Sequence, residues 1–386
     1  MTTRGESRLF PRTVGATRLA PKLISDKWLF TLSVGLVIFG VVMVYSASAV
    51  LAEERFDSQY YFLVRQAMWA VLGLTGLIGA MHIDYHVYQR PRVVFLILGV
   101  CLVLLIAVFF FPPVNHVHRW IRVRSFSFQP SELARLALII FLAAYLDRRI
   151  PAGIKQFWMT LFPCALVAGL VIGLILLQPD FGTALMLGLI LATMLFIVRV
   201  PLKQQATLLI PLPLVMYLAL IRVDWRLDRL RAFLDPWQDP QGRGFQAIQS
   251  LVALGSGGLT GVGFAQGKQK LFFLPEPHTD FIFSQIGEEL GLLGTGALVL
   301  AFGLIFWRGV RIALRAPDSF GMLLATGIIA SITLQALFNM SVAVGLLPIK
   351  GMPLPLISAG GSSLFMTLTM IGILLNIAEQ GKEDAD

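Results

Sequence analysis

Asp280 stands at a boundary between polar and apolar sequence. The stretch 271–291, which reads LFFLPEPHTDFIFSQIGEELG, changes there from a loop to an apolar helix. A carboxylate placed where water meets hydrocarbon is costly unless it is paired or used. Asp280 has His278 beside it and Lys270 upstream, so it is a candidate functional group. The alternative is structural, because Thr279 and Asp280 would also make a good helix start.

A second ionisable site lies in the segment QPSELAR, residues 129–135. Glu132 and Arg135 are three residues apart, so they share one face of a helix. An ionisable pair inside an apolar helix usually faces the protein interior or a water-filled cavity. The pair is therefore either a salt bridge between helices or part of a polar cavity.

A third acid lies in the short segment QPDFGT, residues 178–183, between two apolar runs. Acidic residues near a helix N-terminus complement its dipole and can cap it. Asp180 is accordingly predicted to cap the helix that follows.

Two loop segments could help to build a site. The glycine-rich run 255–263 lacks the GK[ST] ending of a nucleotide-binding loop and is predicted to be a flexible turn or a re-entrant hairpin. The loop 348–355 is rich in proline and carries Lys350. Small residues 358–363 then open the last helix, where they allow close helix approach or expose backbone N–H groups to an anion.

The composition requires a membrane to position these residues. Of 386 residues, 56% are hydrophobic and only 14% are charged, against roughly 25% charged in ordinary soluble domains. The mean hydropathy is +0.77. Apolar runs of about 20 residues can each cross a ~30 Å hydrocarbon layer. The chain is thus predicted to be an all-α polytopic integral membrane protein.

Ten apolar runs are expected to span the membrane. Their cores are 28–51, 66–82, 92–112, 131–147, 157–178, 182–199, 204–222, 281–307, 320–345 and 356–378. The expected organisation is a basic N-terminal tail over 1–27, a membrane domain over 28–379 and a C-terminal tail over 380–386. The one large extracytoplasmic loop is 223–280, with a short interfacial helix expected over 245–254.

Charge sets the expected orientation. With both termini in the cytoplasm, 17 Lys and Arg residues lie inside and 13 outside. Seven of those 13 are Arg222 and the six bases of the long loop 223–280, where the positive-inside rule is weaker. The net charge of +9 is therefore read as topology and lipid contact, with no nucleic-acid partner. Cys101 and Cys164 lie inside apolar runs and are expected to be core residues.

Three arginines oppose the positive-inside rule. Arg119, Arg122 and Arg124 share the outer loop 113–128, which contains no acid. An anionic ligand at the outer membrane surface would explain them. The alternative is pairing with acids of the 223–280 loop.

The motifs LPEPHTDFIFSQIGEELGLLG, PSEL, QPDFGTAL and GMPLPLISAGGSS together resemble the SEDS family of bacterial membrane proteins (shape, elongation, division and sporulation). The resemblance runs from about Trp28 to Glu379. It implies an inverting glycosyltransferase that polymerises lipid II into peptidoglycan glycan strands, with undecaprenyl pyrophosphate as the leaving group. The segments FQPSE and QKLFFLPEPHTDFIF resemble the cell-division branch more than the elongation branch.

The resemblance also implies roles for individual residues. Asp280 matches the family's outer-loop aspartate and is expected to be the catalytic general base. The chain departs from the family at Arg135, where Lys is frequent, and at Ala359, where Tyr is usual. The residues expected to bind substrate are Arg119, Trp120, Glu132, Arg135, Gln178, Asp180, Lys270, His278, Lys350, Ser358 and Ser362.

By the same resemblance, the partners would be lipid II, the undecaprenyl-linked glycan strand, a class B penicillin-binding protein (a transpeptidase) and other divisome membrane proteins. The location would be the bacterial cytoplasmic membrane at the division septum. No protein metal site is predicted, although a divalent cation (Mg or Mn) remains open as a cofactor. The alternatives are a lipid II flippase, an elongation-branch polymerase, a divisome scaffold and a solute transporter.

Overall fold

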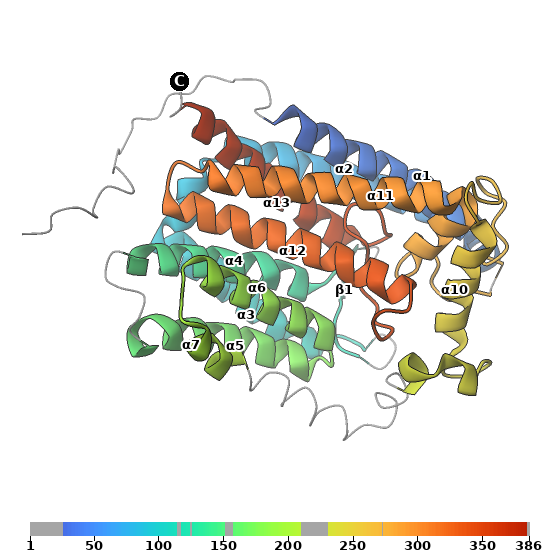
Figure 1. Cartoon of the computed structure of the whole chain (residues 1–386), viewed down its shortest axis with the longest axis horizontal. Coiled ribbons are helices and arrows are strands. Elements are labelled where there is room, and N and C mark those ends of the chain that lie inside the picture. Colours follow the sequence, from blue (N-terminus) through green and yellow to red (C-terminus); the bar gives the residue numbers. More distant parts are fainter. Residues whose placement is uncertain are drawn as a thin grey trace, which may run out of the picture.

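Long helices running side by side make up most of the computed structural model (Figure 1). It describes residues 26–113, 117–123, 126–150, 157–209, 231–271 and 273–383. The long helices are α1 Lys27–Phe56, α2 Tyr61–His82, α3 Pro91–Ala107, α4 Pro130–Arg149, α5 Phe162–Leu177, α6 Phe181–Ile197, α11 Ile282–Leu314, α12 Ser319–Ala343 and α13 Gly361–Glu383. The shorter elements are η1 Tyr85–Gln89, η2 Val108–Phe110, η4 Phe157–Leu161, α7 Leu202–Leu209, η5 Pro236–Gln238 and α10 Phe245–Gly257.

Seven helices of the described chain are long and apolar enough to cross a membrane. They correspond to α1, α2, α3 with η2, α5 with the end of η4, α11, α12 and α13. The shorter α6 is also apolar. The predicted class, a helical multi-pass membrane protein, is confirmed. Of the seventh predicted span, 204–222, the described part ends with α7; most of the N-terminal tail, Arg124 and the last three residues also lie outside the described residues.

The helix α4 is the centre of the bundle. It packs against α3, α5, α6, α12 and α13, and nearly all of its side chains are buried. Its charged residues, among them Glu132 and Arg135, lower its hydropathy. A helix enclosed by other helices can carry such groups because they meet protein rather than lipid.

The bundle has two distinct ends. At the terminal end, defined as the end where α1 begins and α13 finishes, Asp26 accepts the N–H of Leu29 and pairs with Arg308 at 2.6 Å. His86 lies there between Asp84 at 2.7 Å and Asp318 at 2.8 Å. At the opposite end, the loop end, α10 lies across the helix ends (Figure 1).

The loop end contains one element that the sequence predicted and one that it did not. The helix expected over 245–254 is present as α10. The outer loop predicted over 113–128 contains a short antiparallel pair of strands that the sequence analysis did not predict, β1 Ile121–Val123 with β2 Phe126–Phe128. Strands of three residues leave too short an alternation to be read from sequence.

The glycine-rich run packs tightly rather than forming a flexible turn. It lies against a break in α11, where Gly291 has φ 65°. The N–H of Gly263 donates to the carbonyl of Glu289 at 3.1 Å. A Cβ added to Gly261 would lie 2.1 Å from that same carbonyl oxygen. The glycines are therefore required by close backbone approach.

Candidate functional site

Asp280 lies at the loop end, one residue before the cap position of α11, which Phe281 occupies. Its side chain is half-buried. Its carboxylate lies against Gly351, because a Cβ added to that glycine would be 2.7 Å from Oδ2. The backbone carbonyl of Asp280 accepts a hydrogen bond from Asn339 at 2.8 Å. The sequence suggested, as an alternative, that Thr279 and Asp280 form the helix start. In the structure the cap position lies one residue after Asp280.

A cluster of charges forms beside it at the start of α6. Asp180 is the N-cap residue, and its Oδ1 accepts the N–H of Thr183 at 3.3 Å. Lys350 Nζ lies 3.1 Å from the same oxygen. Arg119 Nε donates to the carbonyl of Gln178 at 3.1 Å, and its Nη2 donates to the carbonyl of Pro179. Three segments far apart in sequence thereby bring two cations and one carboxylate together.

The electrostatics of the cluster keep Asp180 ionised. Burial raises the pKa of its carboxyl, but the charges of Lys350 and Arg119 and the hydrogen bond from Thr183 outweigh that effect and lower the pKa to about 2. The pKa of Lys350 is lowered, because the effect of burial exceeds the opposing effects of Asp180 and Asp280. An opposite charge nearby favours the ionised form of each group, and for Asp180 this effect outweighs burial.

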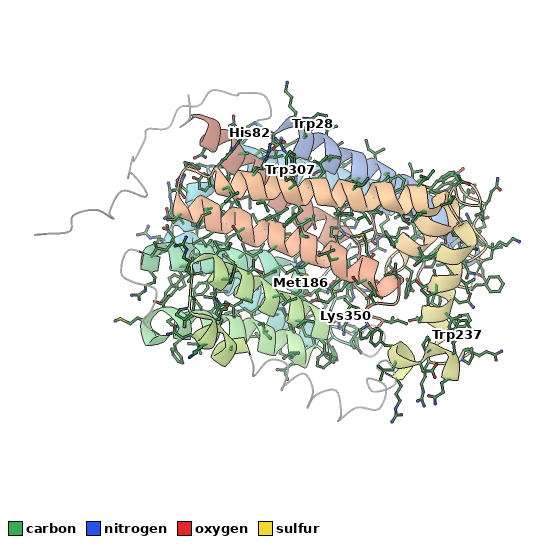
Figure 2. The ribbon with its side chains drawn as sticks, in the orientation of Figure 1. Trp28, His82, Met186, Trp237, Trp307 and Lys350 are labelled. Atoms are coloured by element: carbon green, nitrogen blue, oxygen red, sulfur yellow. The ribbon has the colours of Figure 1, made fainter. Side chains whose placement is uncertain are left out.

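The dipeptide Lys350–Gly351 joins the two aspartates. The Lys350 side chain passes directly beside Gly182 to reach Asp180. A Cβ added to Gly182 would lie 1.7 Å from the lysine Nζ. The next residue, Gly351, lies under the carboxylate of Asp280. Figure 2 shows Lys350 toward the loop end of the bundle. One short loop therefore connects the charged cluster to the candidate base.

The backbone just before Asp280 is held by the last residues of the same connection between α12 and α13 that carries Lys350 and Gly351. Ser358 Oγ donates to the carbonyl of Thr279 at 2.5 Å and accepts the N–H of Leu354 at 2.8 Å. The N–H of Ala359 donates to the carbonyl of His278 at 2.9 Å. Both contacts position backbone, and the contact of Ala359 needs no tyrosine ring.

The ionisable pair on α4 is a link between helices. Arg135 is 1% exposed, pairs with Glu132 and donates to Oε1 of Gln335 on α12. Gln335 Nε2 in turn donates to the carbonyl of Pro353 at 2.9 Å. The pair therefore extends the polar network from the centre of the bundle to the loop that carries Lys350.

Lys270 does not join this network. Its Nζ lies 2.9 Å from Glu289 Oε1 and 3.3 Å from Ser46 Oγ, so its ammonium is compensated in a separate buried pair. This differs from its expected place in a substrate-binding set with Asp280. A residue ten positions upstream can pair elsewhere because the intervening loop turns back on itself, as the bond from Leu274 N to the carbonyl of Gln269 shows.

The remaining predicted residues are placed as follows. Ser362 Oγ accepts the N–H of Gln129 at 3.3 Å, and Gln178 Nε2 donates to the carbonyl of Leu105 at 3.0 Å. Trp120 is half-buried, whereas Arg122 is exposed.

His278 is buried against the ring of Phe62, with ring centroids 4.5 Å apart. Burial lowers the pKa of His278, which favours a neutral imidazole. A neutral ring offers no positive charge to an anion.

The residues predicted from the sequence did not include two buried carboxylates, those of Glu288 and Glu289. Glu288 accepts the N–H groups of Lys268 at 2.7 Å and Gln269 at 3.2 Å. Glu289 accepts from Ser46 at 2.7 Å and pairs with Lys270. Two adjacent acids inside an apolar run were themselves the signal, because ionised groups at such depth need partners.

The described parts of the chain contain no group of three or more His, Cys, Asp and Glu side chains arranged to hold a metal ion.

Together, the fold and the site define a multi-pass helical membrane protein with a cluster of charged residues beside Asp280 at the loop end. The chain belongs to the FtsW/RodA/SpoVE family of cell cycle proteins, whose family model matches residues 27–383. This confirms the resemblance seen in the motifs.

Named relatives and solved structures agree. The chain is 45% identical over 358 residues to a probable peptidoglycan glycosyltransferase FtsW of Geobacter sp. (strain M18), covering 92% of this chain and 96% of the relative. It is 39% identical over 366 residues to stage V sporulation protein E of Bacillus subtilis (strain 168), covering 94% and 99%.

Among solved structures, a chain of a peptidoglycan synthase complex matches with a TM-score of 0.75 at 30% identity, covering 93% of this chain and 99% of that one. The rod shape determining protein RodA of Thermus thermophilus matches with a TM-score of 0.68 at 28% identity, covering 92% and 97%.

Proposed function

We propose that this protein is a peptidoglycan glycosyltransferase that polymerises lipid II into glycan strands during cell division. Family membership and the names of the similar proteins support the activity. The observation that carries the site is the Lys350–Gly351 dipeptide, which contacts Asp180 through one residue and Asp280 through the next. It brings a candidate base next to a charged cluster at one end of the bundle.

In the proposed reaction, Asp280 accepts the proton of the acceptor's 4-hydroxyl group. The hydroxyl oxygen attacks the anomeric carbon of the donor, and the bond from that carbon to undecaprenyl pyrophosphate breaks with its electron pair on the leaving oxygen. Attack from the face opposite the leaving group inverts the anomeric centre. A positioned base contributes about 10²–10⁴-fold to such a step.

The leaving group gains negative charge, so positive groups near it stabilise the transition state. Arg119 suits this role because carbonyl oxygens, rather than a carboxylate, hold its guanidinium. Lys350 is shared with Asp180 and serves the pyrophosphate less directly. Arg122, exposed on the hairpin, extends the positive surface. Glu132 and Arg135 support the network from within the bundle.

The proposed orientation has both termini in the cytoplasm and the loop end outside. The charge distribution supports it. The transpeptidase partner is proposed to be a class B penicillin-binding protein, since a chain of a peptidoglycan synthase complex is a structural neighbour. Location at the septum follows from the division branch.

Orientation is tested with cysteine substitutions at Gln241 and Arg315, both exposed. The native thiols of Cys101 and Cys164 are buried, so background labelling should be low. An impermeant maleimide added to intact cells should label Gln241→Cys and leave Arg315→Cys unlabelled. The opposite pattern would invert the orientation and the site with it.

Activity is tested with the purified protein, bound to its transpeptidase partner with cross-linking blocked, and lipid II as substrate. Glycan chains should form with the native protein and not with Asp280→Asn. A lipid-scrambling assay in vesicles runs beside it. Scrambling without chain synthesis would make the protein a flippase and end the polymerase proposal.

A further inference from the structure

Asn339 lies near the loop end of α12 and is 2% exposed. The sequence marks it only as one of several polar residues on that helix. Its Nδ2 makes two hydrogen bonds, one to the carbonyl of Asp280 at 2.8 Å and one to the carbonyl of Met352 at 2.7 Å. A single amide group therefore uses both of its protons on two different loops.

Those two loops are the ones that form the site. One carries Asp280 into α11, and the other carries Lys350 and Gly351 to it. Asn339 is part of a helix packed inside the bundle. Its hydrogen bonds therefore attach both loops to the same fixed position on α12. Ser358 adds a second contact, through the carbonyl of Thr279, but it lies in the same connection between α12 and α13 as Lys350 and Gly351 rather than on a helix.

We propose that Asn339 is a positioning residue that fixes the Asp280 carboxylate against the Lys350–Gly351 dipeptide. The proposal deepens the polymerase function above and rests on it where it concerns reaction rate. A base displaced by about 1 Å from the attacking hydroxyl costs on the order of 10²-fold in rate. Both bonds of Asn339 act on backbone, so the residue touches no reacting atom.

The partners of Asn339 distinguish it from an ordinary buried polar residue. Its Oδ1 has no hydrogen-bond partner in the described part of the chain, so the side chain's described bonds all go to the two loops. Ser331, two turns earlier on the same helix, has a buried hydroxyl without a described partner. It provides a matched control, since replacing it changes the polarity of α12 without touching either loop.

The first test measures geometry without activity. A Cβ at Gly351 would lie 2.7 Å from Asp280 Oδ2, so cysteines at the two positions lie near the spacing of a disulfide. The full-length protein carrying Asp280→Cys and Gly351→Cys should cross-link quickly under mild oxidation. Adding Asn339→Leu should slow this by about tenfold, because the loops lose their common reference. Adding Ser331→Ala should leave the rate unchanged.

The second test measures the reaction. In the partner-bound protein, Asn339→Leu should lower kcat for chain synthesis about 10²-fold while KM for lipid II stays within about twofold, because binding groups are untouched. Asn339→Ser, which keeps one donor, should recover part of kcat. It also serves as the second variant if Asn339→Leu fails to fold.

Unchanged cross-linking in the folded Asn339→Leu background, or in Asn339→Ser where Asn339→Leu does not fold, would overturn the proposal. So would a loss of kcat matched by Ser331→Ala, since that would show general damage to α12. The cross-linking result stands even if the native protein makes no glycan chains. Failure of the inference and failure of the proposed function are therefore read from different assays.

Discussion

Asp180 and Asp280 both stand at the start of an apolar helix at the loop end, and each is followed by phenylalanine. Asp180 is 3% exposed, occupies the cap position of α6 and binds Thr183 through both its backbone N–H and its hydroxyl. It also pairs with Lys350. Asp280 is half-buried, lies one residue before the cap position and is approached by a glycine.

This difference shows how similar sequence supports different roles. The carboxylate of Asp180 is held by a hydroxyl, an N–H and an ammonium, so it is suited to holding structure. The carboxylate of Asp280 is half-buried and lies beside Gly351, while the Asp280 backbone is fixed by Asn339. A base needs a fixed backbone and an oxygen within reach of the acceptor's hydroxyl.

The largest expected effect is that of Asp280→Asn on reaction rate. Asparagine keeps the shape and can still assist a helix start, but it cannot accept the proton. Chain synthesis from lipid II should fall by about 10²–10⁴-fold, with the melting temperature and transpeptidase binding unchanged. Near-native synthesis in this variant would remove the distinction between the two aspartates.

The second effect is on stability, from Asp180→Asn. Asparagine retains the cap but removes the carboxylate that pairs with Lys350. Removing one partner of a buried pair costs about 3–5 kcal/mol, and the lower end applies because the Lys350 side chain is 20% exposed. Thermal unfolding in detergent should show this loss. As a control, Thr193→Val removes a half-buried hydroxyl on the same helix, ten residues beyond Thr183. This variant should melt like the native protein. Equal melting of Asp180→Asn and the native protein would contradict the structural role.

The third effect is the acid dependence of stability. The pKa of Asp180 is lowered from its ordinary 3.8 to about 2 in the folded protein. A lowered pKa means that the carboxylate stabilises the fold above about pH 4, and that this contribution disappears as pH falls toward 2. It amounts to about 2 kcal/mol. Melting temperatures of the native protein should fall more steeply across this window than those of Asp180→Asn. Parallel curves would show that Asp180 is not paired as described.

The smallest effect concerns Arg119→Gln. Glutamine can still bond to the carbonyls of Gln178 and Pro179 but brings no charge. kcat/KM for lipid II should fall by about tenfold, equivalent to about 1.4 kcal/mol, with protein abundance unchanged. Arg122→Gln, at an exposed position, should have less effect. If the two variants behave alike, the positive charge acts through the whole surface rather than through the bonds near Asp180.

Much of the architecture was determined by the sequence itself. Apolar runs of about 20 residues must cross a membrane as helices, because no other open structure satisfies backbone polar groups in hydrocarbon. The helices therefore fell close to the predicted ranges, and 245–254 became α10. The motifs around Asp280 and Asp180 also predicted the family, and an acid before an apolar helix predicted the cap at Asp180.

Only the tertiary structure decided which polar residues meet. Lys270 and Lys350 both seemed available to Asp280 in the sequence, but Lys270 pairs with Glu289 whereas Lys350 reaches Asp180. Local periodicity carries no information about contacts between residues 170 positions apart. Asn339 resembled any polar residue of a membrane helix, and its importance appears only when Asp280 and Met352 are seen on either side of its amide. Packing brings these groups together, because an unpaired buried polar group costs free energy, which favours arrangements that pair it with a group on whichever segment lies beside it.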